Sequence, residues 1–84
     1  MYWDVVEVSA EKYLILSVRF ADGLVGRVKF LPQRLKGVFA VLKDKEFFNK
    51  VFVDDGVVTW PGELDLAPDA MHAEIKKNGE WILL

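Results

Sequence analysis

The chain has 84 residues, which fits one small domain and leaves little room for a deep internal pocket. Hydrophobic residues make up 52% of the chain and charged residues 29%, a balance that is typical of globular proteins and excludes a disordered chain. The absence of cysteine excludes disulfides, thiolate metal sites and cysteine nucleophiles, and the formal net charge is −2.

Neither export nor membrane insertion is predicted. The first residues include Asp4 and Glu7 and lack the basic stretch that begins a signal peptide. No apolar run approaches the ~20 residues that a helix needs to cross a bilayer. We therefore expect a cytoplasmic protein with no membrane partner.

Three strands are predicted in the first third of the chain. The valine-rich segment 3–8 favours an extended backbone, and segment 13–20 alternates between two faces. Its apolar face carries Leu14, Leu16, Val18 and Phe20. Asp22-Gly23 is typical of a tight hairpin turn, and segment 24–30 then repeats the alternation. These segments predict a three-stranded antiparallel meander with one apolar face and one partly basic face.

The middle of the chain predicts two short helical pieces. Pro32 ends the preceding strand, and the i, i+3, i+4 spacing of Val38, Val41 and Leu42 indicates a short helical turn. Asp44 is a suitable N-cap for a second short helix over residues 45–50. We expect Phe47 or Phe48 of this helix to enter the core.

The last third predicts a second hairpin, a helix and an apolar tail. Asp55-Gly56 forms the hairpin turn between 51–53 and 57–60, and Pro68 begins a helix that ends before Gly79. The tail, residues 80–84, requires burial either on its own core or against a second copy of the chain. The fold class is therefore α+β: a small antiparallel sheet, made of the meander and the second hairpin, with two or three short helices in a single domain over residues 1–84.

The ordered combination of four pieces resembles the bacterial family known as domain of unknown function 2442. These pieces are "VRFADGLVGRVKF", "GVFAVLKD" followed by "FF", the valine-rich strand with its acidic turn, and Trp60-Pro61 followed by "LDLAPD". The resemblance implies a small α+β domain, no established activity and no catalytic residues. Some members of that family continue into a helix-turn-helix domain, and some are encoded beside another small protein, as in toxin–antitoxin pairs. Because this chain stops at Leu84, we do not expect it to bind an operator directly.

The side chains that catalysis would require are scarce. His72 is the only histidine, and we expect it on a helix surface. A cleft that joins His72 to Asp65 and Asp69 would be needed for acid–base catalysis. Asp65 lies between two leucines, and its alternative role is to accept hydrogen bonds from loop amides before the helix. No spacing of calcium or zinc ligands is present, so we predict neither a cofactor nor a metal, and no enzymatic activity.

Charge is distributed unevenly along the chain. Segment 19–50 carries eight basic and three acidic residues, whereas segment 54–69 carries five acidic residues and no basic one. This pattern fits either an ordinary solvated surface or a bipolar molecule that docks a charged partner. A basic sheet face with aromatic residues would suit nucleic acid, but the pI of about 5.3 and the placement of Phe30 opposite Lys29 argue against it.

These observations predict a non-enzymatic protein-interaction module, an adaptor or antitoxin-like partner of a small, basic protein. The predicted contacts are Arg34 and Lys36 on the basic side, with Trp60 and Asp65 on the acidic side. Trp60 has an alternative interpretation as a core residue. The runner-up function is a homodimeric structural domain that pairs through the tail or an edge strand, and a nucleic-acid-binding regulator ranks below both.

Overall fold

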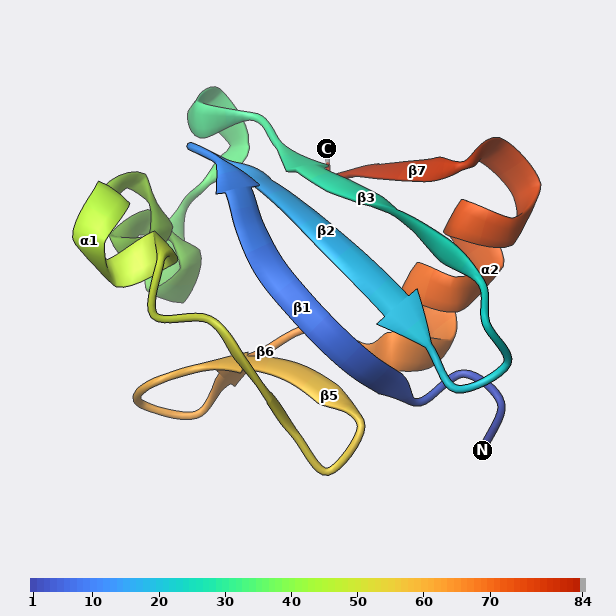
Figure 1. Ribbon diagram of the computed structural model, residues 1–84. Coiled ribbons are helices and arrows are strands. Elements are labelled where there is room, and N and C mark those ends of the chain that lie inside the picture. The colour runs from blue at the N-terminus through green and yellow to red at the C-terminus, as the bar shows by residue number, and fades with distance from the viewer. Residues whose placement is uncertain (84) are drawn as a thin grey trace.

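A computed structural model describes residues 1–83 and contains a four-stranded sheet, here called the large sheet (Figure 1). Its strands are β1 (Val5–Lys12), β2 (Ile15–Phe20), β3 (Val25–Phe30) and β7 (Glu80–Leu83), in the order β1-β2-β3-β7. The first three pair antiparallel, as the meander predicts, and β7 pairs parallel to β3. The α+β prediction is confirmed, but the fourth strand was not predicted.

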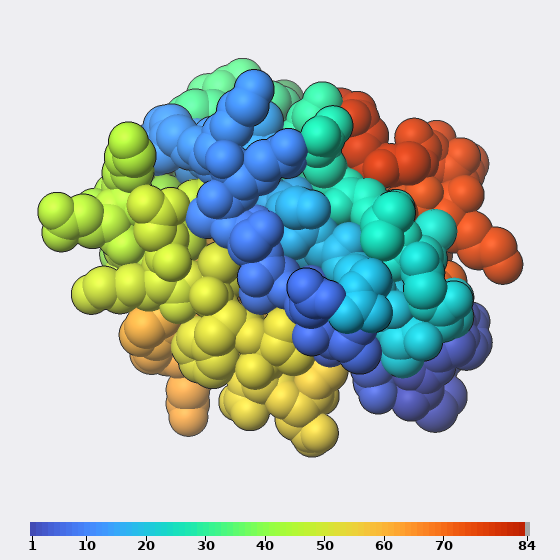
Figure 2. All heavy atoms as spheres, in the orientation of Figure 1, coloured from blue at the N-terminus to red at the C-terminus, as the bar shows by residue number. Residues whose placement is uncertain are grey.

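In β2 and β3 of the large sheet, buried apolar side chains alternate with side chains that face outward. The inner face buries Leu16, Val18, Phe20, Val28 and Phe30, and Leu14 is buried just before β2. The outer face, which occupies the centre of Figure 2, carries ion pairs that join different strands, one of them reaching from β3 across β2 to β1. These pairs are Arg19–Glu7, Arg27–Glu11 and Lys29–Glu80. Most of the basic charge predicted on this face is therefore balanced by carboxylates of the same sheet.

The predicted second hairpin belongs to a separate three-stranded antiparallel sheet, here called the small sheet. Its strands are β4 (Phe52–Asp54), β5 (Val57–Trp60) and β6 (Leu64–Asp65). Asp55 and Gly56 have φ values of 50° and 82°, the left-handed conformations that a two-residue hairpin turn of this type requires. Strand β6 was not predicted, because two residues are too few to produce an alternating pattern.

Residues 1–83 contain four helical segments. They are the 3₁₀ helices η1 (Pro32–Arg34) and η2 (Gly37–Lys43), and the α-helices α1 (Lys45–Phe48) and α2 (Pro68–Asn78). The Asp44 cap is confirmed, since its carboxylate accepts a hydrogen bond from the Glu46 N–H. Within residues 1–83, none of these helices has the length and apolar character that crossing a membrane requires.

The short helical turn predicted from Val38, Val41 and Leu42 is present as η2, but it is a 3₁₀ helix and the three side chains do not share one face. Leu42 is buried, but Val38 and Val41 are exposed. A 3₁₀ helix has three residues per turn, so the i, i+3, i+4 spacing of an α-helix no longer gathers side chains on one face. Of the two phenylalanines of α1, Phe48 is buried and Phe47 is half-buried.

The core lies between the inner face of the large sheet and the two units that cover it. Figure 1 shows α2 on the right, and the small sheet with α1 on the left. Trp60 packs against Phe30 and Phe48, with ring centroids 6.0 Å apart in both cases. On the other side, Ile75 of α2 lies directly over Gly26, where a Cβ atom would lie 2.4 Å from the Ile75 Cγ2.

The described part of the apolar tail, residues 80–83, packs partly against the core of its own domain. Trp81 and Leu83 pack against the core from β7, while Ile82 stays exposed on the outer face. Gly79, with φ of 80°, ends α2 and turns the chain back into β7, as its position predicts. Leu84, the last residue of the tail, lies outside the described residues.

Candidate functional site

The outer face of the small sheet gathers carboxylates beside one exposed aromatic ring. Alternation along the three strands directs Val53, Val58 and Leu64 to the core and the residues between them outward. We call this outer surface the acidic face, and it consists of Phe52, Asp54, Thr59, Glu63 and Asp65. A shallow hollow of about 620 Å³ lies over it.

Strand register sets the geometry of the acidic face. Phe52 pairs with Thr59, and Thr59 pairs with Asp65, so the three residues form one row across the sheet. The turn before β6 contains Gly62 and Glu63 in left-handed conformations, with φ of 89° and 66°. This turn reverses the chain directly after Trp60 and brings Glu63 beside the row.

The carboxylates of the acidic face differ from those of the large sheet in having no cationic partner. Within residues 1–83, Asp54, Glu63 and Asp65 take part in no ion pair, whereas Glu7, Glu11 and Glu80 all do. Phe52, on edge strand β4 at one end of the row, leaves 43% of its surface exposed. The acidic face therefore presents unbalanced negative charge next to an apolar ring.

Trp60 borders the hollow over the acidic face but is buried, so it is not the exposed contact that was predicted. Its side chain is completely buried, and its indole N–H donates a hydrogen bond of 2.9 Å to the Phe48 carbonyl. The alternative interpretation is therefore correct: Trp60 is a core residue at the end of β5. Trp60 supports the small sheet from below and anchors it to α1.

The structure does not bring together the three residues that acid–base catalysis would need. Asp65 opens onto the acidic face, and within residues 1–83 its carboxylate accepts no hydrogen bond, so the predicted loop-bracing role is also absent. Asp69 and His72 line a different hollow of about 410 Å³ beside the N-terminus. No cluster of three or more potential metal ligands occurs among residues 1–83.

His72 is buried rather than on the helix surface, so that prediction is wrong. Its ring lies between Phe20 and Tyr2, with centroid distances of 4.9 Å and 5.0 Å. Its Nε2 lies 2.8 Å from the Asp22 Oδ2 in the first hairpin turn. Hydrogen bonds from the Leu24 N–H and from His72 lower the pKa of Asp22. Fifty positions separate the two partners in sequence, so no local pattern indicates their contact.

Arg34 and Lys36 are exposed, as predicted, but they do not share a surface with Asp65. Arg34 lies at the rim of a small, partly open apolar pocket of about 170 Å³. The pocket is lined by Phe30, Leu35, Phe39, Leu66 and Leu83. Lys36 is not part of its lining. The four predicted contacts therefore separate into one buried residue, one acidic-face residue and two residues near this pocket.

Comparison with known proteins identifies a family and no individual relative. The family described as "Protein of unknown function (DUF2442)" matches residues 5–77, which extend from the start of β1 into the last turn of α2. No curated protein and no solved structure is similar enough to count as a match. Strand β7 lies beyond the matched range.

Proposed function

The chain belongs to the DUF2442 family, and from that premise we propose that it is a cytoplasmic bacterial protein-interaction module without catalytic activity. Its acidic face docks a small, basic protein, in the manner of an adaptor or of the antitoxin in a toxin–antitoxin pair. The observation that carries the proposal is the set of three carboxylates without cationic partners on the same face as Phe52.

Charge and shape of the acidic face both favour a protein partner. Asp54, Glu63 and Asp65 attract a basic surface and orient it during encounter, an effect that weakens as salt screens the charges. Phe52 supplies an exposed apolar contact on the same face as these carboxylates, and aromatic residues are among the side chains that contribute most to binding at protein interfaces. The hollow is shallow and open, which suits a protein surface better than a small substrate.

The proposal is tested by capture of the tagged protein from its native host, followed by binding measurements with the purified partner. We expect a small basic protein in stoichiometric amount, with an affinity that falls as salt rises. The triple variant D54N/E63Q/D65N should weaken binding at least about tenfold. Capture of no stoichiometric partner would overturn the proposal.

A matched control separates the acidic face from net charge. The variant E46Q/D69N/E74Q removes an equal number of negative charges from α1 and α2, away from the acidic face, at residues that form no ion pair within residues 1–83. It should bind the partner as the wild type does. Equal weakening by both variants would mean that overall charge, and not this surface, determines the interaction.

The homodimeric alternative stays a prediction with its own test. Pairing through the tail is no longer required to bury it, because Trp81 and Leu83 already pack in cis. An edge strand is still available for self-association, and light scattering on the purified protein measures the mass in solution. A nucleic-acid role ranks lower because Arg19, Arg27 and Lys29 are paired with carboxylates on the face that would meet the bases.

A further inference from the structure

Strand β7 ends the large sheet and leaves one of its backbone edges open. Within residues 1–83, its backbone hydrogen bonds join it to β3, and no other segment of the chain pairs with its far side. In a paired strand, alternate N–H and C=O groups point away from the neighbour and require another partner. An extended peptide that adds to this edge would satisfy them.

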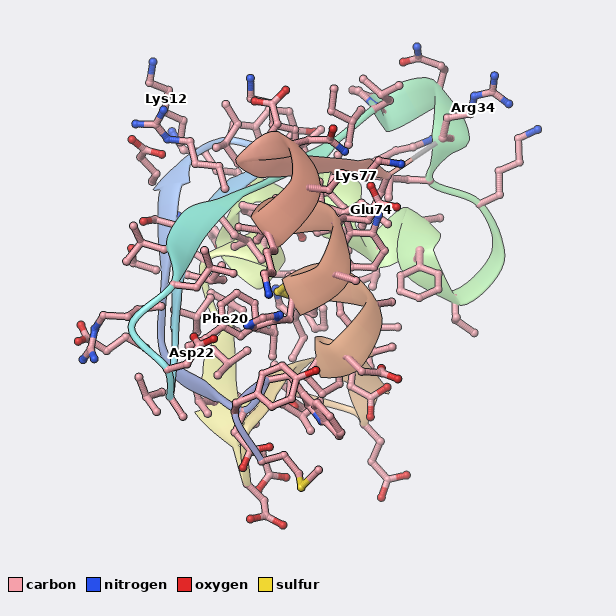
Figure 3. All side chains as sticks on the ribbon, turned by 90° about the vertical axis from the view of Figure 1, so that its right-hand side faces the viewer. Lys12, Phe20, Asp22, Arg34, Glu74 and Lys77 are labelled. Carbon is pink, nitrogen blue, oxygen red and sulfur yellow. The ribbon has the colours of Figure 1, made fainter. Side chains whose placement is uncertain are left out.

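A groove runs beside this open edge. Its volume is about 630 Å³, and its walls are β7 on one side and Glu74 and Asn78 of α2 on the other. In Figure 3, Glu74 points from α2 toward the side of the molecule on which Arg34 lies, whereas Asp22 lies on the opposite side. A strand that is accessible beside a flanking helix is a geometry suited to extended peptides.

The groove leads to the apolar pocket at the end of β7. Leu83 lines both hollows, so the groove and the pocket are adjacent. The pocket volume of about 170 Å³ compares with an apolar cavity of roughly 150 Å³ that accommodates benzene. One branched or aromatic side chain therefore fits the pocket, with its backbone still on the line of β7.

Charged groups at the two ends indicate what kind of segment fits. Within residues 1–83, the Arg34 guanidinium at the pocket rim forms no ion pair, so its donors are available to a carboxylate. Glu74 along the groove accepts a hydrogen bond from Asn78 and forms no ion pair in the described part of the chain. A segment with an anionic end and a basic residue before it complements both.

We propose that this groove and pocket bind the C-terminal segment of a partner protein as an added strand parallel to β7. The final apolar side chain enters the pocket beside Leu35 and Phe39. The terminal carboxylate pairs with Arg34, and a Lys or Arg upstream in the segment faces Glu74. This surface is distinct from the acidic face, so the inference goes beyond the proposed function.

Selection from short random peptides that are displayed with free C-termini tests this inference. We expect enrichment of an apolar final residue, with Lys or Arg at an upstream position. The best enriched sequence is then synthesised with a free carboxylate and with a terminal amide. Amidation should weaken binding at least about tenfold, and amide NMR shifts should change along β7 when the free acid binds.

The variant R34Q should weaken binding of the free acid as much as amidation does, and K36Q should leave it unchanged. Both side chains are exposed, so both variants should fold. The inference would be overturned by selection of no apolar C-terminus, by equal binding of acid and amide, or by a β7-to-β7 dimer that occupies the edge. The triple variant D54N/E63Q/D65N should retain peptide binding, so failure here and failure of the acidic-face proposal are separate results.

Discussion

The two sheets of this protein use surface charge in opposite ways. On the outer face of the large sheet, basic side chains of one strand form ion pairs with acidic side chains of another, as in Arg27–Glu11 and Lys29–Glu80. On the outer face of the small sheet, the charged side chains are all carboxylates, and within residues 1–83 they pair with no cation. Paired charges add little to binding because their partners are already present, so the unpaired face is the better candidate for recognition.

The two sheets also differ in how they are held in place. Strands β1 to β3 have six to eight residues, and each directs one face toward the core, most completely in β2. Strands β4 to β6 have two to four residues, too few for a sheet that is stable on its own. The small sheet therefore depends on the core beneath it, and its charged outer face can vary without loss of the fold.

The largest expected effect comes from the residue on which the small sheet rests. The substitution W60A removes a fully buried ring and should destabilise the protein by about 3–5 kcal/mol, measured by urea unfolding. W60F keeps most of the ring but loses the N–H that donates to the Phe48 carbonyl, so it should cost less. Equal stability of W60A and the wild type would contradict the view that the core holds the small sheet.

The next effect concerns the contact between the large sheet and α2. In G26A, the new Cβ would lie 2.4 Å from the Ile75 Cγ2 and 2.9 Å from the Gly79 carbonyl oxygen. Because the second contact is with backbone, the helix must shift, and we expect a loss of about 1–3 kcal/mol. In the I75A background the closest atoms are absent, so a double-mutant cycle should give a smaller cost for G26A. If the losses of stability in G26A and I75A were simply additive, the contact between residue 26 and Ile75 would not be the cause of the cost of G26A.

Much of this fold could be predicted because its local signals are strong. The alternation in β2 and β3, the Asp-Gly turns, the Asp44 cap and Gly79 each determine their own segment with few residues. The parallel addition of β7 could not be predicted in this way. Residues 80–83 pair with residues 27–30, and only the packing of α2 across the sheet brings these segments together.

The candidate site was harder to predict than the fold. Asp65 was predicted as a contact because acidic residues are concentrated near it in the sequence, and Arg34 because it was expected in a loop. Phe52 was missed as part of the site, since an aromatic residue in a strand gives no sign of which side faces the core. The burial of Trp60 and His72 depends on contacts with Phe48 and Asp22, which lie 12 and 50 positions away.

A smaller effect is expected at the Asp22–His72 contact, and it depends on pH. The Leu24 N–H and His72 lower the pKa of Asp22 in the folded state, so its ionised form stabilises the fold. This stabilisation is complete above the ordinary carboxyl pKa of about 3.9 and is lost as pH falls through the lower, folded value. D22N should therefore unfold more easily at neutral pH and show a shallower loss of stability in acid.

Urea unfolding over a pH series measures this dependence, and D65N is the matched control. Within residues 1–83 the Asp65 carboxylate accepts no hydrogen bond, so D65N should follow the acid dependence of the wild type. If D22N and the wild type lost stability in parallel from neutral pH downward, the Asp22 contact would not contribute to the acid dependence.

The smallest expected effect is on the acidic face itself, and it decides what that face is for. Because the carboxylates of Asp54, Glu63 and Asp65 form no ion pair within residues 1–83, neutralising all three should change the free energy of unfolding by no more than about 0.5 kcal/mol. Removing like charges that lie close together could even raise stability slightly. A loss well above that value would mean that these side chains support the fold, as the ion pairs of the large sheet do. Near-zero change in stability with a large loss of partner binding would instead assign their charge to recognition.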